Sequence, residues 1–284
     1  MSERRGQEVG GTEIEGRRAV LELLRAGTRE VRSVSLSEGV AHDDMVDAIV
    51  EAAGTKLRMV SPDRLRASAQ TDAPQGVVAR AEPLRSADFD ALLADPRAFL
   101  VVLDGVTDPR NLGAIVRAAE TAGVTGMVIA KHRSAPVSAT AAKTAAGAIE
   151  YVPIALVGGI PAALERAKRA GVWCIGLDGD SGTTLTDLPF ATEPLAIVLG
   201  AEGRGLSPLT RRRCDALARI PMRGAIASLN VAAAAAVACH EIARRRGSPS
   251  VLPAPQGRSG PVLPAPRGRS GHGSASRLEG PSPG

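Results

Sequence analysis

The sequence predicts an α/β protein with two domains. Short apolar runs alternate with helical stretches over most of its 284 residues, and 44% of the residues are hydrophobic, enough to bury a core. In the second half, the runs FLVVLDG, GMVIA, GVWCIGL and PLAIVLG are apolar at almost every position. Runs of this kind, without polar alternation, are typical of parallel strands that helices cover on both faces. A doubly covered parallel sheet is therefore expected in the second domain.

The first domain is expected over residues 13–82, after a polar, glycine-rich stretch (1–12) that the composition predicts to be disordered. Its elements follow from the spacing of apolar residues. Helices are expected at 14–26, 41–53 and 62–69, and strands at 31–37, 56–60 and 76–81. Residues 83–97 are charged and contain prolines, which predicts a linker with a short helix.

The second domain is expected over residues 98–246. Besides the four apolar runs, EYVPIA and ALARIP are candidates for short strands. An alanine-rich helix at about 230–246 ends in three arginines and Gly247, which is ordinary chemistry at a helix C-terminus and weak support for RNA binding. From 247 to 284 the chain is rich in Pro, Gly and Ser, and VLPAPQGRSG recurs as VLPAPRGRSG. This composition predicts a disordered basic tail, either inert or weakly attracted to phosphates.

The charge balance leaves several partner classes open. The formal net charge is +5 and the pI about 9.6, which fits contact with a polyanion such as RNA and also fits basic proteins that bind none. Aromatic residues make up only 2%, which disfavours recognition of bases by stacking on an aromatic platform.

Cysteine and histidine usage indicates neither disulfides nor a metal site. Cys174, Cys214 and Cys239 form no CxxC pair, so reduced, buried thiols are expected. The four histidines form no ligand motif, and no metal is expected. With no apolar signal core near Met1 and no apolar run of membrane-spanning length, a soluble cytoplasmic protein is expected.

A first polar motif interrupts the strand–helix unit LDGVTDPRNLGAIVRAAE. Asp108 and Pro109 are explained as the N-cap and first residue of a helix. Asn111 falls in the first helical turn, beside the carboxyl end of a buried strand, where open α/β sheets bind ligands. Arg117 lies off the apolar stripe of that helix and is either a solvated partner of Glu120 or a functional cation.

Two further motifs follow the last long strand. LGAEGRGLSP matches neither the dinucleotide nor the phosphate-loop glycine pattern, and it predicts a tight turn or a close-approach loop in which Glu202 accepts from a cationic or neutral polar ligand. In RIPMRGAIASLNVAAAAA, Ser228 or Asn230 could cap the last helix, but one cap does not explain both residues.

The three motifs, in this order and at these spacings over about residues 99–246, resemble the SPOUT superfamily of methyltransferases. They are most similar to the TrmH-type RNA ribose 2′-O-methyltransferases, and among these to the bacterial 23S ribosomal RNA guanosine 2′-O-methyltransferases. The resemblance implies a deep trefoil knot, a homodimer, an RNA substrate and S-adenosylmethionine as methyl donor, with no metal. It also implies which residues act. Arg117, Asn111, Glu202, Ser228 and Asn230 are implied for catalysis, and Leu199, Gly200, Ile220, Met222 and Leu229 for cofactor binding.

The first domain is similar to the small L30e-like RNA-binding domain that precedes the catalytic domain in relatives. This chain reads Glu15-Gly16-Arg17-Arg18 where relatives often begin with Tyr-Gly-x-His or Tyr-Gly-x-Asn, so RNA contacts are expected to fall on arginines. It also has Ala232 where relatives often carry a serine. Three alternatives remain. A transfer-RNA ribose methyltransferase shares the motifs, and a self-resistance enzyme that modifies another ribosomal nucleotide shares the architecture. A catalytically silent RNA-binding or ribosome-assembly factor is disfavoured, because all five residues implied for catalysis are retained.

Overall fold

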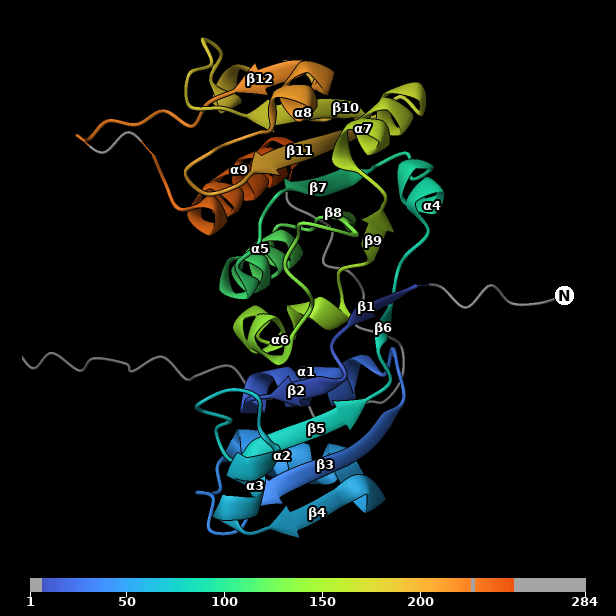
Figure 1. Cartoon of the computed structure of the whole chain (residues 1–284), viewed down its shortest axis with the longest axis vertical. Helices are drawn as coiled ribbons and strands as arrows, with labels where there is room; N and C mark the ends of the chain where they lie inside the picture. The colour runs from blue at the N-terminus through green and yellow to red at the C-terminus, as the bar shows by residue number, and fades with distance from the viewer. Residues whose placement is uncertain (1–6, 226–227, 248–284) are drawn as a thin grey trace, which may run out of the picture. The chain divides into compact units, whose positions relative to one another are not determined.

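A six-stranded parallel sheet forms the centre of the second half of the chain, in a computed structural model that describes residues 7–225 and 228–247 (Figure 1). The strand order is β12-β10-β11-β7-β8-β9, and each neighbouring pair is parallel, as the unbroken apolar runs predicted. The strands are β7 (Phe99–Asp104), β8 (Gly126–Ala130), β9 (Ile154–Val157), β10 (Trp173–Leu177), β11 (Leu195–Gly200) and β12 (Ala216–Ala218).

Helices cover both faces of this sheet (Figure 1). Val101 and Leu103 pack in one hydrophobic core, while Leu100 and Val102 pack in another, so these successive positions of β7 all need apolar side chains. The first core is closed by α5 (Pro109–Thr121), α6 (Ala139–Ala145) and α9 (Val231–Arg245), and the second by α4 (Phe89–Leu93) and α7 (Ile160–Arg169). The short helix α8 (Pro208–Arg213) connects β11 to β12.

A smaller mixed sheet of order β2-β5-β3-β4 lies within residues 13–82. Its β5 is antiparallel to both β2 and β3, whereas β3 and β4 are parallel. Its core holds apolar residues of α1 and α2 against the sheet. The elements are β2 (Glu13–Glu15), α1 (Arg17–Ala26), β3 (Val31–Ser37), α2 (Asp44–Ala53), β4 (Leu57–Val60), α3 (Pro62–Ser68) and β5 (Val77–Ala81).

The prediction of a helix from residue 14 is wrong at its start. Glu13–Glu15 is a strand paired with β5, and Gly16, at φ 94°, separates it from α1. That backbone conformation is easy for glycine and costly for other residues. A three-residue strand is too short to show a period of two, which is why the apolar pattern merged it with the helix.

The predicted disorder of residues 1–12 is also wrong in part. β1 (Glu8–Gly10) pairs antiparallel with β6 (Leu84–Arg85), which lies in the predicted linker 83–97. The short helix expected in that linker is α4. Residues 1–6, and the predicted tail apart from Gly247, lie outside the described residues.

One buried ion pair connects residues of the small sheet's half to the half that holds the parallel sheet. Arg29 and Glu150 lie 2.6 Å apart, with side chains 6% and 1% exposed. Arg29 also donates to the carbonyl of Glu82 at 2.7 Å, and the Thr28 hydroxyl donates to Glu150 at 3.3 Å. The charges are thus taken out of water with hydrogen-bond partners supplied, the condition under which a buried pair is tolerated.

The three cysteines are free, as expected. Burial raises the pKa of Cys174, Cys214 and Cys239 to about 12 in each case. Thiols with such pKa values are almost fully protonated at neutral pH and behave as small apolar side chains. Within the described ranges, no helix is long and apolar enough to cross a membrane.

Candidate active site

The candidate site lies where the connections of the parallel sheet change direction. β7 is followed by α5 and β8 on one side, while its other neighbour, β11, leads away through α8 to β12. Such a point between two adjacent carboxyl ends is where open α/β sheets bind ligands. A pocket of about 220 Å³ occupies it. Its lining comes from the segments after β7 and β11 and from the starts of α5 and α9: Gly105, Val106, Thr107, Asp108, Asn111, Ala201, Glu202, Arg204 and Val231.

The loop after β11 is a tight turn. The backbone N–H groups of Ala201 and Gly205 each donate to the other residue's carbonyl, at 3.0 and 2.9 Å. Gly203 and Gly205 have φ values of 75° and 66°. A Cβ at Gly200 would lie 2.1 Å from the carbonyl carbon of Gly205, so this position has no room for any side chain. The glycine spacing therefore has a structural cause, and the turn holds Glu202 at the pocket.

Three predicted site residues from three distant segments meet at this pocket. The Asn111 amide donates to Glu202 at 3.1 Å, and its carbonyl oxygen accepts from the Asn230 amide at 3.1 Å. The Asn230 amide also approaches Glu202 at 3.4 Å. Asn111 is 9% exposed, so its orientation is fixed by these bonds.

Asn230 is the cap of the last helix. Its side-chain oxygen accepts from the Ala232 backbone N–H at 2.8 Å, which leaves its amide for Asn111 and Glu202. Asp108 caps α5 in the predicted way, accepting from Arg110 at 2.8 Å. Ser228 is exposed and lies beside the undescribed residues 226–227. It does not line the pocket, and no hydrogen bond in the described chain joins it to the other three residues.

Arg117 lies on the same helix as Asn111 but is not hydrogen-bonded to it. Its side chain is exposed, and no residue in the described part of the chain forms an ion pair with it. The alternative of a surface pair with Glu120 is therefore not found. An uncommitted guanidinium remains on α5, the helix that supplies Asn111.

The five residues predicted to bind the cofactor fall into two groups, one at the end of β11 and one with more exposed apolar side chains. Leu199 is 1% exposed in the core, so only its backbone can meet a ligand, and Gly200 has no side chain. Ile220 is half-buried, while Met222 and Leu229 are 38% and 40% exposed. These three apolar side chains lie in the segment between β12 and α9, and nothing described covers the last two.

Two residues, one lining the pocket and one directly preceding its wall, escaped the sequence analysis. Arg204 lines the pocket and is exposed, and Asp104, at the end of β7, accepts from the Ser207 backbone N–H at 2.8 Å. The cation between two glycines in AEGRG could have indicated Arg204. The role of Asp104 could not be recognised in the sequence, because its hydrogen-bond partner lies 103 positions away.

The arginines that end α9 are used within the chain. Arg244 pairs with Glu241 at 2.8 Å. Arg246 donates to the carbonyls of Ala191, Arg97 and Ala98 at 2.9, 3.1 and 3.2 Å, and its burial lowers the pKa of the guanidinium. The interpretation of this triplet as a helix end rather than an RNA contact agrees with this geometry.

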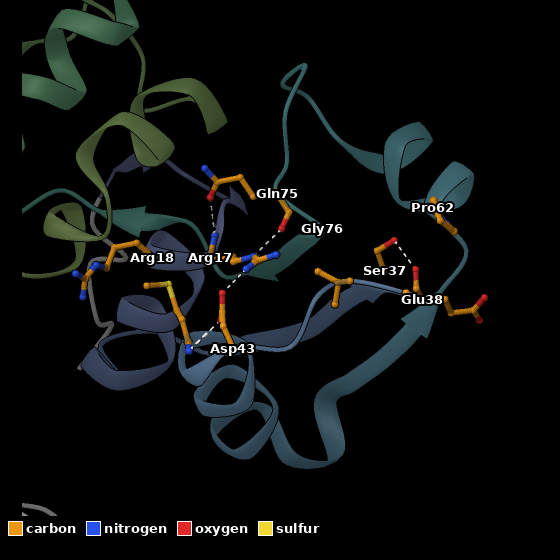
Figure 2. Close-up of a pocket in the computed structure, with 11 residues that line it drawn as sticks. Arg17, Arg18, Ser37, Glu38, Asp43, Pro62, Gln75 and Gly76 are labelled. Atoms are coloured by element: carbon orange, nitrogen blue, oxygen red, sulfur yellow. Dashed lines mark hydrogen bonds and ion pairs between the residues drawn. The ribbon is translucent and has the colours of Figure 1, made fainter. Parts of the chain in front are cut away.

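A second, larger hollow of about 760 Å³ lies in the first domain, between the starts of α1, α2 and α3 (Figure 2). Figure 2 shows Arg17 held between Gln75 and Asp43. Its guanidinium donates to the Gln75 carbonyl at 3.2 Å and pairs with Asp43 at 2.5 Å. Backbone N–H groups of α2, first that of Val46, and the charge of Arg17 hold the pKa of Asp43 below its ordinary value. Arg18 and Glu38 line the same hollow and are exposed.

No metal centre is indicated in the part of the chain that the structure describes, where no three His, Cys, Asp or Glu side chains gather as ligands. The smaller pocket instead presents the carboxylates of Asp108 and Glu202, an amide and a guanidinium. The Asn230 amide is bonded to two of these groups.

Comparison with known proteins places this geometry in a family. Residues 98–240 match the SpoU rRNA Methylase family, and residues 14–87 match a domain described as RNA 2'-O ribose methyltransferase substrate binding. The 23S rRNA (guanosine-2'-O-)-methyltransferase RlmB of Ralstonia nicotianae is 41% identical over 84% of this chain and 96% of its own length. The enzyme of the same name from Pseudomonas aeruginosa is 39% identical over 82% and 96%.

Among solved structures, the SpoU methyltransferase AviRb from Streptomyces viridochromogenes, in complex with AdoMet, superposes with a TM-score of 0.71. It is 26% identical and covers 83% of this chain and 90% of its own. Fold and site thus define a parallel-sheet α/β protein with a ligand pocket at the switch point of its sheet. The chain belongs to the SpoU rRNA Methylase family.

Proposed function

We propose that this protein transfers a methyl group from S-adenosylmethionine to the ribose 2′-hydroxyl of a guanosine in 23S ribosomal RNA. The observation that carries the proposal is the hydrogen-bonded set Asn111, Glu202 and Asn230 at the switch point of the sheet. It occurs in a chain that is about 40% identical, over nearly their whole length, to relatives named for this reaction.

The pocket suits this methyl donor by its chemistry. S-adenosylmethionine carries a sulfonium, an ammonium, a carboxylate and an adenosine, has a net positive charge, and contains no phosphate. A glycine turn that holds a carboxylate, Glu202, fits a cationic ligand better than a phosphate. We assign the adenosine to the backbone of Leu199 and Gly200 and to the apolar side chains of Ile220, Met222 and Leu229.

S-adenosylmethionine brings an already activated methyl group, so this chain has to supply alignment and to help the hydroxyl lose its proton. Arg117 is a poor general base, because an arginine pKa lies above about 12. We assign to it the stabilisation of the developing alkoxide and a hold on the neighbouring phosphate, for which a planar cationic fork is well suited. Asn111, Glu202, Asn230 and Ser228 then orient the donor and the ribose.

The first domain is proposed to be L30e-like and to bind the RNA, with boundaries at 13–82, a connection at 83–97 and the methyltransferase domain at 98–246. The substrate-binding match over residues 14–87 and the arginine-lined hollow of Figure 2 support this assignment. Arg17 and Arg18 occupy the positions where an RNA contact is expected.

Three further features belong to the proposal: a trefoil knot in the C-terminal part, a homodimer and action in the cytoplasm. The return of the chain from the edge strand β12 to α9, which packs with α5 and β11, supports the knot. The exposed apolar side chain of Val237, which no cofactor assignment uses, supports a dimer that covers the outer face of α9. Sedimentation should then give twice the mass of the chain.

The test is methylation with labelled S-adenosylmethionine, offered separately 23S ribosomal RNA, 16S ribosomal RNA and transfer RNA, followed by mapping of the methylated nucleotide. Label on one guanosine 2′-oxygen of 23S RNA is the expected result. Label confined to transfer RNA would contradict the assignment of 23S ribosomal RNA as the substrate. Absence of transfer to every RNA, including ribosomal assembly intermediates, would indicate a silent RNA-binding factor.

A further inference from the structure

We infer that Lys131 and Arg133 form a binding site for backbone phosphates of the RNA on the flank of the methyl-transfer pocket. This inference rests on the proposed function. The two cations belong to a Lys-His-Arg segment that directly follows β8, so they lie at the same carboxyl edge of the sheet as the pocket after β7 and β11.

A backbone hydrogen bond joins this loop to the pocket wall. The Ala135 N–H donates to the carbonyl of Val106, a pocket residue, at 2.8 Å. On its other side the loop is fixed by the bond from the Lys131 N–H to the Val157 carbonyl at 2.9 Å, and the Ser134 hydroxyl donates to the Ala130 carbonyl. The loop therefore lies next to the pocket and is held in one shape.

The charges of this loop are not neutralised by its own chain. Lys131, His132 and Arg133 are exposed, and in the described ranges none of them forms an ion pair. The acidic groups at this edge are already engaged: Asp104 accepts from Ser207, Asp108 caps α5, and Glu202 is bound by Asn111 and Asn230. None of these carboxylates forms an ion pair with Lys131 or Arg133 in the described ranges, so both cations are available to the RNA backbone, which requires positive charge.

Arg133 adopts a conformation that has a cost. Its φ is 61°, in the left-handed region, where a residue with a side chain is less stable by about 1–2 kcal/mol. Such conformations persist where the surrounding structure enforces them and are frequent at ligand contacts. Here the hydrogen bonds at both ends of the loop enforce it, and the result is an exposed guanidinium on a preorganised backbone.

The loop also leads toward the first domain. Two residues beyond Ala135, which bonds to Val106, the carbonyl of Val137 accepts a hydrogen bond from the Gly11 N–H at 2.7 Å. The segment that begins with Lys131 and Arg133 therefore contacts first the pocket wall, through Ala135, and then the stretch preceding the first domain, through Val137. We assign to this site the nucleotides that flank the methylated ribose.

The test compares the full chain with the double variants K131A/R133A and R97A/R169A. Arg97 and Arg169 are also exposed and without ion pairs in the described chain, but Arg97 precedes β7 and Arg169 ends α7, at the opposite edge of the sheet. Binding of 23S RNA fragments is measured from low to moderate salt, together with methylation kinetics and S-adenosylmethionine affinity. The charge-preserving variant K131R/R133K is included.

K131A/R133A should bind RNA about 10- to 100-fold more weakly, and its log–log salt slope should be shallower by about 1.4–1.8, since each phosphate contact contributes about 0.7–0.9. Its KM for RNA should rise while S-adenosylmethionine affinity stays unchanged, and R97A/R169A and K131R/R133K should behave like the parent. If the parent methylates RNA but K131A/R133A keeps the parental RNA affinity and salt slope, the inferred phosphate site is wrong and the proposed function still stands. A parent that methylates no RNA would instead overturn the proposed function.

Discussion

At the scale of single residues, the replacement of Arg117 is expected to affect the rate of methyl transfer without affecting cofactor binding. Arg117 is exposed, without an ion pair in the described chain, and outside the set formed by Asn111, Glu202 and Asn230. Its replacement by alanine should lower the rate of methyl transfer by about 100-fold or more, the range reported for removing one group that stabilises a developing oxyanion. The measurement is single-turnover methylation with saturating RNA and S-adenosylmethionine.

Calorimetry supplies the control for that experiment. Arg117→Ala should bind S-adenosylmethionine as the parent does, because no bond to the pocket residues is lost. Parental turnover in this variant would make Arg117 a surface residue, and lost cofactor affinity would place it in the binding site instead. Arg117→Lys should recover only part of the rate, since a lysine lacks the planar fork.

Asn111 provides a residue-scale prediction about pH. In Asn111→Asp a carboxylate replaces the amide that lies 3.1 Å from Glu202, and two carboxylates at that distance cannot both ionise without repulsion. One pKa of the pair is therefore raised. Above that pKa the two charges repel and the turn after β11 is loosened; below it a shared proton restores a hydrogen bond.

The expected outcome is that S-adenosylmethionine binds Asn111→Asp about tenfold more weakly than the parent at pH 8, a difference of about 1.4 kcal/mol. The deficit should shrink as the pH falls toward 5. Asn111→Ala has no second carboxylate, so its affinity relative to the parent should not change over that range. A pH-independent deficit in the aspartate variant would contradict the shared-proton explanation.

Residue roles were predictable only in part from the sequence. Asp108 could be identified as a cap because a cap depends on neighbours within three positions. The joint position of Asn111, Glu202 and Asn230 could not be worked out from local pattern, because the bonds span 91 and 119 residues, and it came from the resemblance to a family. Local pattern also gave no reason to doubt a pair between Arg117 and Glu120.

At the scale of elements, the turn after β11 depends on Gly200. A Cβ there would lie 2.1–2.3 Å from backbone atoms of Gly205 and Leu206, which cannot rotate away. Gly200→Ala should therefore open the turn, displace Glu202 and reduce S-adenosylmethionine affinity by at least about tenfold, with overpacking costing about 1–3 kcal/mol of stability. Calorimetry and urea unfolding measure the two effects.

Gly179→Ala is the matched control, because a Cβ at Gly179 meets nothing within 4 Å and its φ is not in the left-handed region. It should bind the cofactor like the parent. If Gly200→Ala bound equally well, the turn would not be what positions the pocket.

The elements of the sheet were predictable because burial on both faces leaves an unmistakable apolar run, as in FLVVLD and LAIVLG. The short ones were not. Glu13–Glu15 and Glu8–Gly10 are strands whose partners, β5 and β6, lie more than 60 residues away. Three residues contain too little pattern to distinguish a strand from a helix end or a coil.

At the scale of the whole molecule, strand order is what brings the site together. The sequence indicated parallel strands, but not that β11 lies beside β7, because hydrophobic runs do not specify which strands are neighbours. That adjacency creates the switch point, and with it the pocket between Asp108 and Glu202. Asn111 and Glu202, 91 residues apart in the sequence, thus meet only through the topology.

The buried pair Arg29–Glu150 gives the prediction at this scale. Glu150→Ala leaves a guanidinium only 6% exposed without its carboxylate, and removing one partner of a buried pair costs about 3–5 kcal/mol. Glu165→Ala removes a partner from the pair Arg213–Glu165, whose side chains are 47% and 45% exposed, and should cost no more than about 1 kcal/mol. Urea unfolding of both variants measures the difference.

The same variant tests whether the pair connects RNA binding to catalysis. Arg29 follows α1 and also donates to the Glu82 carbonyl, while Glu150 comes shortly after α6, which packs on α5. If the pair is needed for RNA bound by the first domain to reach the pocket, Glu150→Ala should raise the KM for RNA. The affinity of the folded protein for S-adenosylmethionine should then stay unchanged. If the pair only stabilises the fold, the free energy of unfolding will fall while the KM for RNA and the S-adenosylmethionine affinity stay at the parental values. In the described chain, neither Asn111 nor Glu202 forms a hydrogen bond or ion pair with Arg29 or Glu150.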